Sequence, residues 1–316
     1  MKILITGATG FIGRSLISNL SGLGLEVAVV VRRENKDIPD GIEQFEMGDF
    51  DESTDYMPCL KGMNCVVHLA GMAHVLKGHE SKIIDDFRKV NVGFTVSLAK
   101  QANKAGVKKF IFLSSIGVNG NQSSAPVSEN DYPNPQEAYA ISKYEAEQQL
   151  LKLGIASDLD VTIIRPPLVY GKGAPGNFGR IIKWATSPIL FPLPLGAINN
   201  SRSFIAIDNL ISFIVICVRH KKAANQIFVV SDDEILSTTQ VLRGCAQAYN
   251  RRAILIPVPI NWLLWCAKLF GKEIDAIRLL STLVIDNSKA KNMLDWTPRV
   301  TLKQQLTESA GNEENI

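Results

Sequence analysis

The chain has 316 residues, a net charge of +3 and 46% hydrophobic residues, which is enough to bury one large core or two moderate ones. Its basic residues are scattered and no apolar run reaches the roughly 18–20 residues of a membrane span, so we expect neither nucleic-acid binding nor a membrane span. The five cysteines and four histidines show no metal-binding spacing, which predicts reduced thiols and no metal. No signal-peptide pattern follows Met1, and we therefore expect a cytoplasmic protein.

The first apolar run, residues 2–6, is a predicted strand that leads into three glycines and a predicted helix at residues 14–22. Gly7 would allow a tight turn, Gly10 a close approach of the backbone to a ligand, and Gly13 close packing of the helix on the sheet. Bare N–H groups at the start of a helix bind a pyrophosphate. The N-terminus therefore predicts a dinucleotide cofactor, although a glycine turn alone is often only a turn.

Short apolar runs then alternate with helical stretches. The predicted strands are residues 2–6, 26–31, 42–47, 65–70, 109–114 and 161–165, and the predicted helices are residues 14–22, 85–105 and 139–153. This alternation predicts an α/β fold in which a doubly wound parallel sheet is covered by helices on both faces.

The composition changes after Arg165, where glycines and prolines become frequent. We assign residues 1–165 to a dinucleotide-binding domain with a return segment near residues 203–220, and residues 166–316 mainly to a smaller, mixed substrate-binding domain. Residues 254–270 are apolar but interrupted by two prolines, and they are interpreted as a buried or interface helix. A membrane-surface helix around Trp262 and Trp265 stays open as the alternative.

Two segments carry candidate catalytic groups. Tyr139 and Lys143 are four residues apart and share one helix face, where an ammonium can lower the pKa of a phenol and fit it for proton transfer. The same spacing also occurs by chance on amphipathic helices. Ser115 ends a predicted strand, where it could hydrogen-bond a substrate oxygen or simply cap a turn.

Together these motifs resemble the extended short-chain dehydrogenase/reductase family of nucleotide-sugar epimerases, dehydratases and reductases. The resemblance extends over nearly the whole chain, through TGATGFIG at 6–13, HLAG at 68–71, YAISK at 139–143, RPPLVYG at 165–171, RSFI at 202–205 and LDWTP at 294–298. It implies an NAD(P)-binding Rossmann fold. The pattern looks most like bacterial reductases of UDP-4-keto-6-deoxy-N-acetylhexosamines.

The resemblance also implies roles for individual residues. Tyr139 would be the general acid/base, Lys143 would tune it and hold the nicotinamide ribose, and Ser115 would orient the sugar oxygen. The implied cofactor-binding residues are Gly7, Gly10, Phe11, Ile12, Gly13, Arg32, Arg33, Asp49, Phe50, Leu69, Ala70, Gly71, Tyr139, Lys143 and Pro166. The implied substrate-binding residues are His74, Ser115, Asn177, Arg202 and Arg278, of which the two arginines would hold a diphosphate.

Two segments depart from the common pattern of this family, one at Arg32 and Arg33 and the other in the loop after Ser115. Arg32 and Arg33 stand where NAD-using relatives often carry an acidic residue, which favours NADP(H), with NAD(H) as the alternative. Ile116-Gly117 replaces the Asp-Glu pair of many dehydratases, so 4,6-dehydration is disfavoured. Asn119 stands where relatives often carry a tyrosine in this loop, which weakens the prediction of a typical UDP-galactose epimerisation.

We therefore predict an NAD(P)-dependent oxidoreductase acting at C4 of a UDP-linked sugar, with reduction of a 4-keto sugar as the main hypothesis. The alternatives are an NAD-dependent UDP-hexose or UDP-N-acetylhexosamine 4-epimerase and a non-catalytic dinucleotide-binding regulator. The sequence does not say which sugar is bound or what its C4 stereochemistry is. It also does not distinguish a nucleotide-linked from a lipid-linked sugar. A homodimer is expected through helices near residues 87–105 and 139–153.

Overall fold

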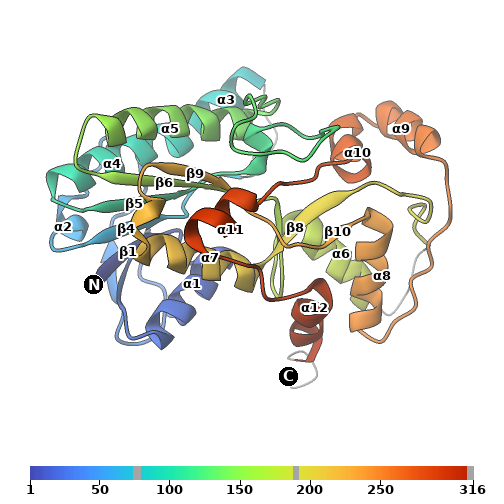
Figure 1. The fold of residues 1–316 in the computed structure, drawn as a ribbon, viewed down its shortest axis with the longest axis horizontal. Coiled ribbons are helices and arrows are strands. Elements are labelled where there is room, and N and C mark those ends of the chain that lie inside the picture. Colours follow the sequence, from blue (N-terminus) through green and yellow to red (C-terminus); the bar gives the residue numbers. More distant parts are fainter. Residues whose placement is uncertain (74–79, 188–191, 312–316) are drawn as a thin grey trace.

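The computed structural model describes residues 1–73, 80–187 and 192–311. A seven-stranded sheet with the order β3-β2-β1-β4-β5-β6-β9 forms its larger part, and all neighbouring strands are parallel (Figure 1). These strands are β1 (Lys2–Thr6), β2 (Glu26–Val31), β3 (Glu43–Glu46), β4 (Cys65–His68), β5 (Lys109–Leu113), β6 (Asp160–Arg165) and β9 (Gln226–Val229). The predicted doubly wound α/β fold is confirmed.

Helices cover both faces of this sheet (Figure 1). One face packs against α1 (Phe11–Gly22), α7 (Ile207–Arg219) and α11 (Ser288–Leu294), and the other against α2 (Met57–Leu60), α4 (Thr95–Lys104) and α5 (Ala138–Ile155). Ile3 and Ile5 of β1 point to the first face and Leu4 to the second, and all three are fully buried. Burial on both sides explains why the strands are apolar at successive positions instead of alternating.

The predicted helix at residues 85–105 consists of α3 (Glu80–Arg88), a wider π-helical turn at Lys89–Phe94, and α4. The wide turn places Asn91 inside the protein, where its side chain accepts from Met72 N and donates to Met72 O and Ser142 Oγ. These bonds tie the loop after β4 to α5, and π-helical turns are frequent at functional sites.

The C-terminal part has its own core and its own sheet, of order β10-β8-β7, in which β7 and β8 are parallel and β10 is antiparallel to β8. Its strands are β7 (Leu168–Tyr170), β8 (Arg202–Ala206) and β10 (Ile235–Leu236), and its helices are α6 (Gly176–Thr186), α8 (Thr238–Ala248), α9 (Ile260–Leu269), α10 (Glu273–Leu280) and α12 (Leu302–Gly311). The chain returns to the large sheet through α7 and β9. The domain boundaries drawn from the sequence stay a prediction.

No helix in the described ranges is long and apolar enough to cross a membrane. Nor do the described residues contain a group of three His, Cys, Asp or Glu side chains placed to hold a metal. Residues 254–270 are interpreted from the sequence as a buried or interface helix. Helix α9 has no buried residue, so the buried alternative is wrong for α9 and the interface alternative stays a prediction.

Candidate functional site

A pocket of about 730 Å³ lies at the carboxyl ends of β1, β2 and β4. The predicted cofactor-binding residues that line it are Gly7, Gly10, Arg32, Arg33, Asp49, Phe50, Leu69, Ala70 and Gly71. Its size falls in the range of about 300–1,000 Å³ that is typical of small-molecule sites. The topology thus gathers the glycine turn and three strand ends around one cavity, which is where open parallel sheets bind nucleotides.

The glycine turn has the geometry that a pyrophosphate cradle needs. Gly7 has a φ of +74°, and a Cβ at this position would lie 2.7 Å from Ala70 N. Gly10 N donates to Gly7 O (3.1 Å) and opens α1. At Gly13 a Cβ would lie 2.8 Å from the Ala8 Cα, so this glycine lets the helix pack on the turn. The residues present therefore fit a bound dinucleotide.

Six other predicted cofactor-binding residues do not line this pocket: Phe11, Ile12, Gly13, Tyr139, Lys143 and Pro166. Phe11 instead packs against the core under the large sheet and against the C-terminal core. Pro166 O accepts from Ile116 N (2.9 Å), which fixes the ends of β6 and β5 beside each other.

Arg32 and Arg33 lie exposed at the carboxyl end of β2 and line the pocket together with Asn35. This is the strand end at which dinucleotide-binding proteins distinguish a ribose 2′-hydroxyl from a 2′-phosphate. The preference for NADP(H) stays a prediction.

Ser115 caps the short helical turn Ile116–Val118, because its Oγ accepts from Gly117 N (3.1 Å). The capping role considered from the sequence is therefore present. In this bond the Ser115 oxygen accepts, so the hydroxyl proton can still be donated to a ligand.

Lys143 is buried against the end of β5. Its Nζ donates to Leu113 O (2.9 Å), lies 4.5 Å from the centre of the Phe112 ring, and would be 3.1 Å from a Cβ at Gly71. Burial lowers the pKa of Lys143 to about 8, an effect opposed by the charge of Glu147. The ammonium thus adjoins the wall of the nucleotide pocket.

Tyr139 lies one helical turn before Lys143 on α5, with its ring 6.1 Å from that of Phe87. Burial raises the pKa of Tyr139 to about 12, whereas the spacing predicts a lowered pKa. The physical reason for the raised pKa is desolvation of the phenol; the Lys143 ammonium itself donates to the Leu113 carbonyl. Without ligands the phenol is therefore protonated.

The two predicted diphosphate arginines belong to one polar network. Arg202 Nη1 donates to Ser281 O (2.9 Å) and Oγ (3.2 Å), and Ser281 Oγ donates to Asn121 O (3.1 Å). Asn121 Nδ2 donates to Glu137 Oε1 (2.9 Å), and Glu137 forms an ion pair with Arg278. No carboxylate of the described residues pairs with Arg202.

This network brings both arginines toward the start of α5, where Glu137 is only two residues from Tyr139. Burial lowers the pKa of Arg202 to about 10. An arginine that is partly desolvated and lacks an acidic partner is prepared for an anionic ligand. His74 lies outside the described residues; Asn177 lies in α6, but its side chain is outside them too.

A buried ion pair that was not predicted from the sequence lies behind the site. Arg165 Nε donates to Glu147 Oε1 (2.9 Å), Nη2 donates to Glu147 Oε2 (2.5 Å), and Nη1 donates to Asn119 Oδ1 (3.0 Å). Two signals could have found it: Glu147 is four residues beyond Lys143 on the same helix, and Arg165 ends a buried strand. Asn119, noted as a departure from the family, thus supports Arg165.

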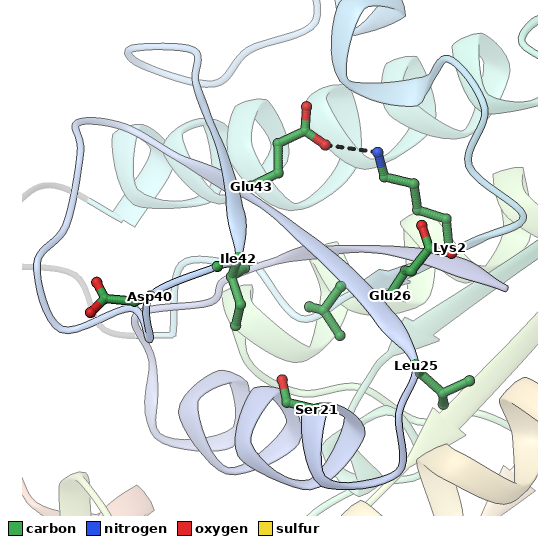
Figure 2. Close-up of a pocket in the computed structure, with 9 residues that line it drawn as sticks. Lys2, Ser21, Leu25, Glu26, Asp40, Ile42 and Glu43 are labelled. Atoms are coloured by element: carbon green, nitrogen blue, oxygen red, sulfur yellow. Dashed lines mark hydrogen bonds and ion pairs between the residues drawn. The ribbon is translucent and has the colours of Figure 1, made fainter.

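A second pocket, of about 370 Å³, lies at the opposite edge of the sheet, at the amino ends of β1 and β2 (Figure 2). Figure 2 shows Lys2 reaching Glu43 across it, with a distance of 2.7 Å between Lys2 Nζ and Glu43 Oε2. None of the predicted site residues lines it. The candidate catalytic groups lie at the carboxyl edge instead.

Comparisons with known proteins agree with this geometry. Residues 3–231 match the model of the NAD dependent epimerase/dehydratase family. The chain is 42% identical over 318 residues to a UDP-glucose 4-epimerase of Vibrio cholerae, covering 98% of this chain and 94% of the relative.

Solved structures share the fold at lower identity. The complex of MoeE5 with UDP-glucuronic acid and NAD has a TM-score of 0.80 at 23% identity and covers all of both chains. A UDP-N-acetylglucosamine 4-epimerase from Bacillus cereus has a TM-score of 0.81 at 18% identity and covers 99% of each chain. With the glycine cradle and the site at the carboxyl edge of the sheet, the family match establishes that the chain belongs to the NAD-dependent epimerase/dehydratase family.

Proposed function

We propose that this protein is a 4-epimerase of a UDP-linked hexose or N-acetylhexosamine that keeps its nicotinamide cofactor bound through the reaction. The observation that carries the proposal is the 42% identity, over nearly the whole chain, to a UDP-glucose 4-epimerase. This was the alternative in the sequence analysis, and it now takes precedence over the 4-keto sugar reductase. Ile116 and Gly117, in place of an acidic pair, argue against dehydration.

The proposed roles follow the geometry of the site. The backbone at Gly7 and Gly10 would hold the pyrophosphate, and Lys143 would donate to the nicotinamide ribose from beside Gly71. Arg202 and Arg278 would hold the substrate diphosphate, which requires Arg278 to exchange Glu137 for the ligand. Planar guanidinium groups donate paired hydrogen bonds to such oxygens.

When bound, the oxidised dinucleotide supplies a hydride acceptor and a positive charge close to the sugar. A cation beside a phenol favours the phenolate, so the pKa of Tyr139, which burial raises to about 12, is expected to fall in the complex. Tyr139 would take the proton of the C4 hydroxyl while the bound nicotinamide serves as acceptor for the C4 hydride, and Ser115 Oγ would donate to the same oxygen. Return of that hydride and of the proton to the opposite face of C4 would invert the centre with no net oxidation.

The reductase stays the second candidate because of Arg32 and Arg33. Two arginines at the end of β2 line the nucleotide pocket, and they suit a 2′-phosphate and thus an exchangeable NADPH.

Product analysis separates the two candidates. The purified protein is incubated with UDP-glucose or UDP-N-acetylglucosamine, and separately with a UDP-4-keto-6-deoxy-N-acetylhexosamine and NADPH. Products and reduced nicotinamide are measured together. The epimerase forms the C4 epimer to equilibrium without net change in reduced cofactor. Consumption of one NADPH per 4-keto sugar, with no epimer from either UDP-sugar, would overturn the proposal in favour of the reductase.

A further inference from the structure

The C-terminal part meets the catalytic helix α5 through an ion pair that a bound diphosphate would have to break. Arg278 lies in the last turn of α10, and Glu137 directly precedes the first turn of α5. The two side chains form an ion pair in which Arg278 is 37% and Glu137 20% exposed. One of the two guanidinium groups proposed to hold the substrate is therefore already paired with an anion of the protein itself.

The Glu137 carboxylate is held from two sides. Asn121 Nδ2 donates to Glu137 Oε1 (2.9 Å), and Arg278 Nη2 pairs with Glu137 Oε2. Although Glu137 is the N-cap residue of α5, its side chain makes no capping hydrogen bond to that helix. Stabilisation of the start of α5 therefore does not explain this carboxylate, whose oxygens are directed to the arginine and the amide.

Arg202 differs from Arg278 in this respect. Its Nη1 donates to the carbonyl and the hydroxyl of Ser281, which are both uncharged, and no carboxylate of the described residues pairs with it. A phosphate that reaches Arg202 therefore adds a charged partner, whereas a phosphate that reaches Arg278 replaces one. Hydrogen bonds between ionised groups are the strong ones, so this exchange has a substantial cost.

We propose that Glu137 competes with the substrate diphosphate for Arg278 and thereby limits how tightly the protein holds its nucleotide sugar. The inference rests on the proposed function, because it takes a UDP-linked sugar as the substrate. An ion pair that forms again when the ligand leaves stabilises the empty site. A 4-epimerase releases a product with the same diphosphate as its substrate, so this pair weakens the binding of both and favours product release.

A purely structural role explains the ion pair less well. The loop before α5 extends to α10 in Figure 1, and backbone hydrogen bonds already join it to the segment after that helix. Ser123 N donates to Thr282 O (2.9 Å), and Val127 N donates to Val284 O (2.8 Å). Ion pairs that water reaches add little to stability, so these contacts should keep α10 in place when Glu137 is replaced.

Titration calorimetry with UDP tests the proposal on the full-length protein saturated with NAD⁺. Glu137→Gln keeps the length of the side chain and removes its charge, and we expect UDP to bind about tenfold more tightly than to the wild type, the lower end for a hydrogen bond to a charged group. Glu137→Ala should show the same gain. Glu145→Gln, which removes the same charge from the surface pair with Arg88 on α5, is the matched control and should bind UDP as the wild type does.

A double-mutant cycle assigns the gain to Arg278. Arg278→Gln alone should weaken UDP binding, and Glu137→Gln added to it should change the UDP affinity no further, since no arginine is left to compete for. With the UDP-linked sugar as substrate, Glu137→Gln should lower KM without raising kcat, as a change in ground-state binding does. NAD⁺ affinity and circular dichroism should match those of the wild type.

Three results would overturn the proposal. The first is UDP affinity that is unchanged or weaker in folded Glu137→Gln and Glu137→Ala; the proposed function would survive it if Arg202→Gln still weakens UDP binding. The second is a gain in UDP affinity that persists in the Arg278→Gln background, because it would then be a general effect of removing a negative charge. The third is a wild type that binds no UDP, which would overturn the proposed function as well.

Discussion

Replacing Glu147 by Gln should destabilise the protein more than any other single change of a charged residue on α5. Glu147 is fully buried and Arg165 is 2% exposed, and the guanidinium makes three contacts of 2.5–3.2 Å with the carboxylate. Removing one partner of such a pair leaves a buried, uncompensated charge and costs about 3–5 kcal/mol. For a chain of this size each kcal/mol lowers Tm by roughly 2 °C, so we expect a fall of roughly 6–10 °C.

Thermal unfolding followed by circular dichroism measures this change. Glu145→Gln is a matched control on the same helix, because Glu145 pairs with Arg88 at the surface, where the side chains are 31% and 48% exposed. Solvent screens that pair, and Tm should stay close to the wild-type value. The double variant Glu147→Leu/Arg165→Met should recover most of the loss, since it buries no charge.

The same substitution should act on the site. The Glu147 charge opposes the effect of burial on Lys143, so the pKa of Lys143 should fall below about 8 when that charge is removed. The affinity for the dinucleotide should then weaken at a lower pH than in the wild type. A Glu147→Gln protein with an unchanged Tm would refute the reasoning about the buried pair.

The remaining predictions concern ligand binding. Gly13→Ala should weaken NAD(H) binding at least about tenfold, because a Cβ at this position would lie 2.9 Å from Ala8 O. Gly22→Ala is the control, since a Cβ there has no atom within 4 Å. Equal NAD(H) affinities of the two variants in titration calorimetry would contradict the role of the glycine turn in binding the pyrophosphate. NAD(H) affinity should fall as the pH rises through about 8, where Lys143 loses its proton, and Lys143→Met should bind NAD(H) weakly at every pH. A wild-type NAD(H) affinity that does not change with pH would exclude a contact between the Lys143 ammonium and the dinucleotide. Arg202→Gln should weaken UDP binding by about 10–100-fold and leave NAD(H) binding unchanged. If calorimetry shows that the variant loses affinity for both UDP and NAD(H), Arg202 has a merely structural role.

The sequence predicted the parts of the fold that depend on local patterns. Apolar strands alternating with helices indicated the parallel sheet. The glycine turn indicated a dinucleotide pocket, and Gly7 and Gly10 line that pocket in the structure. Strand ends that follow one another along a parallel sheet meet at one edge, so the convergence of Arg32 and Asp49 could also be predicted.

Contacts between distant segments could not be predicted in the same way. The pairing of Glu147 with Arg165 depends on which helix residue faces the end of β6, and the ion pair of Arg278 with Glu137 depends on how the C-terminal part sits on α5. The raised pKa of Tyr139 likewise follows from desolvation in the folded protein, which helix spacing does not reveal. An apolar helix pattern also does not say whether anything covers it, as α9 demonstrates.

Proton NMR of the purified protein with NAD⁺ and either UDP-glucose or UDP-N-acetylglucosamine tests the central claim most directly, with wild type and Tyr139→Phe in parallel. We expect the wild type to convert at least one of the two UDP-sugars to its C4 epimer, and Tyr139→Phe to bind NAD⁺ but to lose at least about 100-fold in rate, the least that a general acid–base group contributes. Equal conversion by both proteins, or retention of the original C4 configuration by the wild type with UDP-glucose and with UDP-N-acetylglucosamine, would contradict it.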